Sequence, residues 1–150
     1  MSLNLKIIQL SELDEIIDYE KKKLVEILPD EMDREMQAWN SRWRKESLEH
    51  YLPMGWSFLA RDEQDRLLGY FIAQPLLFLD NQTQSLWVEH LQYSTLEARD
   101  QLCDLANKLC REKHFQKVYF AASSSIASVL KTMKGEDWHP QAIQIKTTKV

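Results

Sequence analysis

The hydrophobic period of this 150-residue chain changes near Gly55, and this change constrains the fold more than any other feature of the sequence. Over residues 13–28 and 32–43, apolar side chains recur three or four positions apart, which is the spacing of helices that bury one face. Over residues 56–93, apolar and polar residues alternate instead, as they do in half-buried strands. The sequence therefore predicts two helices followed by antiparallel strands.

Turn and cap signals divide the chain into a definite order of elements. Pro29 closes the first helix, and Ser94-Thr95-Leu96-Glu97 forms a predicted capping box, with Ser94 as the cap of the helix after the third central strand. The expected elements are a strand at 5–10, helices at 11–28 and from Asp30 or Asp33 to 50, strands at 56–60, 67–79 and 85–93, a helix at 94–114, a strand at 118–122, a helix at 126–133 and a last strand at 142–148.

Composition indicates a soluble globular domain that spans residues 1–150. Apolar residues make up 44% and charged residues 28% of the chain. The formal charge of -4, from 19 basic and 23 acidic residues, lacks the basic footprint of a nucleic-acid-binding protein. No run of about 18 apolar residues is present, so we expect no membrane-spanning segment.

The two cysteines, Cys103 and Cys110, lie seven positions apart in a helical pattern, about 10 Å along one helix. This distance is too long for a disulfide between them or for one zinc ion shared with His114. Residues 1–4 also lack the charged region followed by an apolar run that is typical of a secretory signal peptide. We therefore expect a cytoplasmic protein with packed cysteines and without a metal site.

The predicted element order resembles the GNAT family of acyl-CoA-dependent N-acetyltransferases over nearly the whole chain. Residues 67–72 are similar to the third strand of that family. Residues 86–93, with the capped helix that follows, are similar to its fourth strand and cofactor-binding helix. The resemblance implies an α+β fold with a mixed, mostly antiparallel central sheet flanked by helices on both faces.

The resemblance also implies that acetyl-CoA lies between splayed fourth and fifth strands, with its pyrophosphate at a helix N-terminus. Two features depart from the family: no glycine lies between Gly69 and Gly135, where the phosphate loop carries them, and Leu130 stands where a tyrosine acid is common. A cap at Ser94 would also occupy an N–H that pyrophosphate needs. The implied cofactor residues are Leu91, Gln92, Tyr93, Ser94, Thr95 and Arg99.

Transfer of an acyl group to an amine benefits from a base that keeps the amine neutral, and the fourth strand of the family commonly supplies it. Glu89, between Trp87 and Leu91, is the leading candidate, although a strand glutamate can equally pair with a basic side chain. His90, predicted on the opposite face, is the second candidate, with a hydrogen-bonded core histidine as the alternative. Tyr93 is a third, as a proton donor, a groove residue or an ordinary strand aromatic.

Tryptophans predict an acceptor pocket, with Trp39 and Trp43 on one helix face and Trp56 beside them, although aromatic stripes at this spacing also suit a core. Two functions follow. The first is an N-acyltransferase that acts on a small-molecule or peptide amine. The second is a non-catalytic module of the same fold that has lost its CoA site and binds proteins or itself, for which five tryptophans allow an apolar patch and a homodimer.

Overall fold

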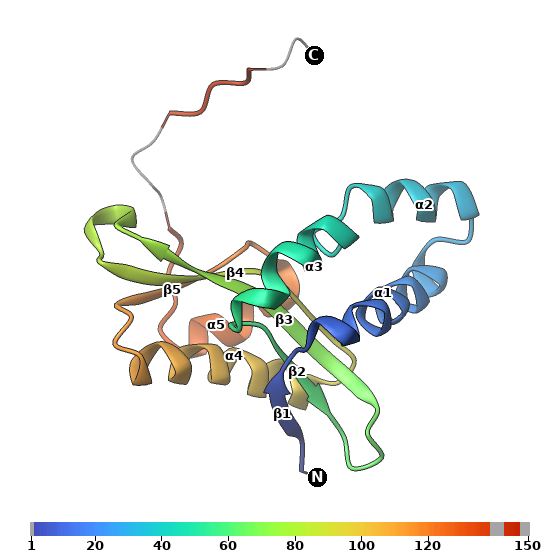
Figure 1. The fold of residues 1–150 in the computed structure, drawn as a ribbon, viewed down its shortest axis with the longest axis horizontal. Coiled ribbons are helices and arrows are strands. Elements are labelled where there is room, and N and C mark those ends of the chain that lie inside the picture. Colours follow the sequence, from blue (N-terminus) through green and yellow to red (C-terminus); the bar gives the residue numbers. More distant parts are fainter. Residues whose placement is uncertain (1, 139–142, 148–150) are drawn as a thin grey trace.

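The computed structural model describes residues 2–138 and 143–147, and its elements confirm the expected α+β fold (Figure 1). Five strands form one sheet in the order β1-β2-β3-β4-β5, in which the first three neighbouring pairs are antiparallel and β5 runs parallel to β4. The elements are β1 (Asn4–Ile7), α1 (Leu13–Ile27), α2 (Glu31–Trp39), α3 (Lys45–Tyr51), β2 (Phe58–Arg61), β3 (Leu67–Leu77), β4 (Gln84–Tyr93), α4 (Leu96–Glu112), β5 (Lys117–Phe120) and α5 (Ser124–Thr132), with short 3-10 turns at Leu10–Glu12, Leu52–Met54 and Leu79–Asn81.

Helices cover both faces of the sheet because its strands present apolar side chains in both directions. Phe71 and Val88 pack with Leu102 of α4 in one core. Tyr70 and Ile72 pack in a second core on the other face, which includes Ile16 of α1 and Leu48 of α3. We call these two sides of the sheet the α4 face and the α1 face. In the described part of the chain, no helix has both the length and the apolar character needed to cross a membrane.

A β-bulge in β4 changes which side chains share a face. Ile72 pairs with His90 and the next residue of β3, Ala73, pairs with Val88, so Glu89 is an extra residue in its strand. As a result Val88 and Leu91 both belong to the α4-face core, and Glu89 and His90 both contact groups on the α1 face. The expectation that Glu89 and His90 point in opposite directions is wrong, because simple alternation ignores the extra residue.

The predicted long second helix is in fact two helices. α2 ends at Trp39 and α3 begins at Lys45, so Trp39 and Trp43 share no helix face. Asn40 donates its side-chain N–H to the carbonyl of Met36, and the Ser41 hydroxyl donates to the carbonyl of Ala38. Such local bonds compete with the continuing backbone ladder and favour helix ends.

The predicted last strand is absent over residues 143–147, which have no regular structure and leave Ile143 and Ile145 largely exposed. Residues 142 and 148, the ends of that prediction, lie outside the described residues. Alternation alone does not form a strand, because a strand is stable only when another strand pairs with it.

Candidate functional site

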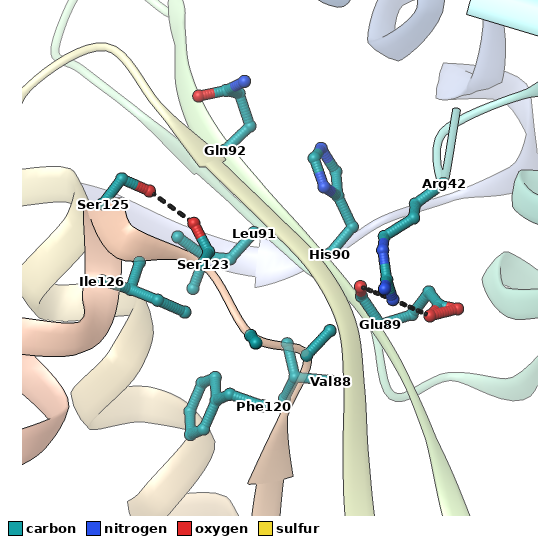
Figure 2. Close-up of a pocket in the computed structure, with 12 residues that line it drawn as sticks. Arg42, Val88, Glu89, His90, Leu91, Gln92, Phe120, Ser123, Ser125 and Ile126 are labelled. Carbon is teal, nitrogen blue, oxygen red and sulfur yellow. Dashed lines mark hydrogen bonds and ion pairs between the residues drawn. The ribbon is translucent and has the colours of Figure 1, made fainter. Parts of the chain in front are cut away.

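β4 and β5 separate partway along their length, and this separation creates the site. They pair from Ser85 and Lys117 to Val88 and Phe120, and one further backbone bond of 2.9 Å joins the Ala121 N–H to the Val88 carbonyl. Beyond that point β4 continues to Tyr93, whereas the segment that follows β5 turns away into α5 (Figure 2). We call the space between them the β4–β5 opening. It holds a cavity of about 120 Å³, lined by Arg42, residues 88–92, residues 120–123, Ser125 and Ile126.

Two side chains bridge the far end of the β4–β5 opening. The Tyr93 hydroxyl donates to the carbonyl of Ser125 over 3.3 Å, and Arg99 donates to the same carbonyl over 3.5 Å. Arg99 also forms an ion pair of 2.9 Å with Asp100 and lies over the Tyr93 ring. The predicted phosphate ligand therefore has a carboxylate partner, and its contacts across the opening are long and weak.

The cap of α4 differs from the predicted capping box. Thr95 is the N-cap, and its hydroxyl accepts a 3.1 Å hydrogen bond from the Ala98 N–H. Ser94 instead extends the strand, because its N–H donates to the Leu68 carbonyl, and its hydroxyl lies 2.7 Å from the Tyr19 hydroxyl of α1. The prediction that Ser94 caps this helix is therefore wrong. The cap still uses one backbone N–H of the first turn, because the Ala98 N–H donates to Thr95 and is not free for a ligand.

Glu89 sits in the bulge with both carboxylate oxygens occupied. Oε1 accepts from the Arg42 guanidinium at 2.5 Å (Figure 2). Oε2 accepts from the Tyr51 hydroxyl at 3.3 Å. Burial, and then the charge of Glu89, raise the pKa of Tyr51 to about 12, so that this phenol remains a donor. The ion pair that sequence reasoning offered as the alternative for Glu89 is present, and a free carboxylate would require exposed Arg42 to move.

His90 has a carboxylate partner that sequence reasoning missed. Its Nε2 lies 3.2 Å from Oε1 of Glu20, a residue of α1 that is 3% exposed. The buried Tyr70 hydroxyl donates to the same oxygen over 3.1 Å. Burial and the Glu20 charge hold the pKa of Tyr70 well above its ordinary range. The available signal was a glutamate at helical spacing between Ile16 and Leu24, inside an otherwise apolar stripe.

The three tryptophans predicted to share an acceptor pocket lie apart. Trp39 is 75% exposed at the end of α2, whereas Trp43 is buried. Trp56 packs against Phe115 on the α4 face, with ring centroids 4.9 Å apart. The helix break at residues 40–44 places Trp39 and Trp43 in different segments, and Trp56 packs on the α4 face, so a shared acceptor pocket stays a prediction.

The remaining predicted residues lie in ordinary packing environments. Leu91 is buried in the α4-face core, and the Gln92 side chain accepts from the Tyr93 N–H. Cys103 and Cys110 are also buried there, and burial raises their pKa to about 12 and about 11. Both thiols are therefore protonated and unreactive at neutral pH.

No protein-family model and no curated protein matches this chain. Solved structures do match its fold. A GCN5-related N-acetyltransferase from Ralstonia eutropha JMP134 superposes with a TM-score of 0.67 at 12% identity, over 96% of this chain and 99% of that one. A predicted acetyltransferase with acetyl-CoA from Clostridium acetobutylicum gives 0.65 at 10% identity, over 97% and 96%. A polyamine N-acetyltransferase of Drosophila melanogaster, which forms N-acetylagmatine, gives 0.61 at 12% identity, over 89% and 82%.

These similarities define the class of the chain by its architecture. Five strands with one parallel pair that splays apart, and helices on both faces, make up the GNAT fold, as the sequence predicted.

Proposed function

We propose that this protein is an N-acyltransferase that moves an acetyl group from acetyl-CoA to a primary amine. The observation that carries the proposal is the β4–β5 opening, whose wall includes the bulge that turns Glu89 and His90 toward one face of the sheet. The fold shared with acetyltransferases supports it, although fold alone does not define a reaction.

The residues around the opening suit an acetyl thioester. The N–H groups of Leu96 and Glu97 begin α4 and precede any intrahelical partner, as an anion at a helix N-terminus requires. Arg99 can turn to a phosphate by giving up its 3.5 Å contact with Ser125. Residues 88–92 and Ile126 would enclose the acyl end. When bound, acetyl-CoA supplies an acyl carbon activated by a thiolate leaving group.

The chain itself must provide a base, and the bulge offers two. Each Glu89 oxygen has a spare lone pair, but the carboxylate is held in an ion pair with Arg42 and also accepts from Tyr51, whereas Nδ1 of His90 has no hydrogen-bond partner among the described residues. A base must have an unoccupied lone pair within reach of the amine. We therefore assign the base to His90, and we assign to Glu89 the role of holding Arg42 and Tyr51 at the edge of the site.

Titration calorimetry with acetyl-CoA and with CoA, up to millimolar concentration, tests the binding step. We expect saturable binding and a rise in melting temperature. Ser123→Trp, at the cavity wall just before α5, should weaken binding at least tenfold, while Ser128→Trp, at an exposed position of α5, should not. The absence of heat and of any melting shift for the unaltered protein would refute the proposal.

A panel of amines then tests turnover. Because one structural neighbour forms N-acetylagmatine, the panel begins with agmatine and polyamines and continues with peptide N-termini. We expect His90→Gln to lower kcat by about 100-fold or more with binding of acetyl-CoA retained. Loss of turnover in Glu89→Gln but not in His90→Gln would return the base to Glu89.

A non-catalytic module of the same fold is the second candidate. The observations that favour it are the Thr95 cap on α4, the bridging of the opening by Tyr93, and the ion pair that occupies Glu89. This candidate predicts no binding of CoA, together with self-association or protein binding. Sedimentation of the purified protein across a concentration series distinguishes the self-associating form from a monomer.

A further inference from the structure

We propose that Glu20 of α1 is a positioning residue, which fixes the ring of His90 so that Nδ1 is the nitrogen that accepts the proton of the acceptor amine. The proposal rests on the proposed N-acyltransferase function for its chemistry. The orientation of the ring can be tested independently of that function. Glu20 lies in a helix 70 residues before His90, so the two residues meet only through the tertiary fold.

The hydrogen bonds around Glu20 determine the proton on His90. A buried ionised carboxylate can only accept hydrogen bonds, and Oε1 of Glu20 has two neighbours, the Tyr70 hydroxyl at 3.1 Å and Nε2 of His90 at 3.2 Å. Nε2 must therefore carry a hydrogen. In the neutral imidazole this leaves Nδ1 unprotonated and able to accept a proton.

The packing around Glu20 makes this arrangement rigid. Glu20 is 3% exposed and Tyr70 is fully buried, so neither side chain has room to move away. The rings of Tyr70 and His90 lie edge to face with centroids 5.8 Å apart. The His90 side chain itself is 20% exposed and borders the β4–β5 opening, which gives it access to a ligand. A fixed carboxylate behind an accessible imidazole is the arrangement that orients a general base.

Several ionisable groups surround the ring and define its electrostatics. Glu20 of α1 and Tyr70 of β3 contact the ring, and Tyr19 of α1 in turn packs against Tyr70. On the other side, Glu89 of β4 is neutralised by its ion pair with Arg42. Among the described residues, Glu20 is therefore the carboxylate whose oxygen lies within hydrogen-bond distance of the His90 ring.

In the proposed step, His90 accepts at Nδ1 the proton released by the amine. The amine nitrogen forms a C–N bond with the acyl carbon, the C–S bond breaks, and its electron pair leaves with the CoA thiolate. The imidazolium then returns its proton to solvent or to the thiolate. Glu20 touches no reacting atom in this scheme, so its effect is exerted only through the orientation and charge of the ring.

Nitrogen-15 NMR of the histidine rings in the ligand-free protein tests the positioning without any assay of activity. At a pH where His90 is neutral, we expect the Nε2–H tautomer to predominate. Glu20→Gln should shift the tautomer balance, because a carboxamide can donate as well as accept. Glu26→Gln, an exposed position of the same helix, should leave it unchanged. A predominant Nδ1–H tautomer in the unaltered protein overturns the proposal, and this measurement needs no variant to fold.

Kinetics test the consequence for catalysis. We expect Glu20→Gln to lower kcat by roughly 10- to 100-fold, with KM for acetyl-CoA unchanged. A kcat equal to that of the unaltered protein overturns the positioning role. If the unaltered protein acetylates no amine, the proposed function fails, and the tautomer measurement decides the Glu20–His90 arrangement separately.

Discussion

At the scale of single residues, one buried guanidinium ties the start of α1 to the end of β2. Arg61 is 6% exposed. It donates to Glu12 and to both oxygens of Glu15 at 2.7 Å, with Asp65 at 3.6 Å. Such a bidentate pair is strong and geometrically specific, in contrast to exposed ion pairs. The position of α1, and with it the position of Glu20, therefore depends on this cluster.

Removal of Arg61 should destabilise the fold. Arg61→Met leaves Glu12 and Glu15 without their donor, and we expect a loss of about 2 kcal/mol in the free energy of unfolding. Urea denaturation measures it. Lys108→Met, which breaks the exposed pair of Lys108 and Asp104, should cost less than about 0.5 kcal/mol. Equal losses in the two variants would contradict a structural role for the Arg61 cluster.

The same cluster predicts a dependence of stability on pH. The hydrogen bond from Arg61 lowers the pKa of Glu15 below 4.5, its ordinary value. A carboxyl with a lowered folded-state pKa stabilises the fold above its unfolded pKa, and this contribution is lost as the pH falls through the folded value. The urea concentration at the unfolding midpoint should therefore decrease as the pH is lowered from about 5 to about 3. In Glu15→Gln the fall should be shallower, and an equally steep fall would argue against this assignment.

At the scale of elements, only one of two adjacent hydroxyl residues, Thr95 and not Ser94, caps α4. Thr95→Ala removes the acceptor of the Ala98 N–H and should lower the free energy of unfolding by about 1 kcal/mol. Ser94→Ala leaves this cap intact and removes only the bond to Tyr19. Thermal unfolding followed by the helical signal in circular dichroism should show a larger drop in melting temperature for Thr95→Ala than for Ser94→Ala. The opposite order would restore Ser94 as the cap.

Contact between β3, β4 and α4 depends on the missing side chain of Gly69. A Cβ at this position would lie 2.8 Å from the Gln92 carbonyl oxygen and 3.0 Å from Leu102. Gly69→Ala should therefore force the strands apart and cost about 2 kcal/mol. Gly55→Ala is the matched comparison, since Gly55 has a left-handed φ of 79° but nothing within 4 Å. It should cost about 1 kcal/mol, and a larger loss than in Gly69→Ala would argue against steric exclusion.

Periodicity predicted these elements better than it predicted their faces. The spacing of Leu13, Ile16 and Leu24 was enough to locate α1, because a helix repeats its buried positions regularly. One extra residue in β4 reversed the phase of the strand, and local bonds from Asn40 and Ser41 broke a helix whose apolar pattern continued. Glu20 and His90 meet only through the tertiary fold, so sequence reasoning could propose His90 without finding its partner.

At the scale of the whole molecule, the two faces of the sheet have different chemistry. The α4 face carries a mainly apolar core that includes both cysteines. The α1 face carries the Glu20–His90 contact and the Glu89–Arg42 pair. The β4–β5 opening lies at the boundary between them (Figure 2). This separation is consistent with a ligand that enters between the strands and a polar reactant that approaches over the α1 face.

Trp138, in the described residues that follow α5, packs against β5, the edge strand of this sheet. The Trp138 ring packs on Tyr119 of β5 with centroids 4.5 Å apart, and it shields a tyrosine that is otherwise at the sheet edge. Trp138→Ala should lower the free energy of unfolding by about 2 kcal/mol through lost aromatic contact and burial. Trp39→Ala, at an exposed position, should change it by less than about 0.5 kcal/mol. Urea denaturation compares the two, and equal effects would show that the Trp138 contact does not stabilise β5.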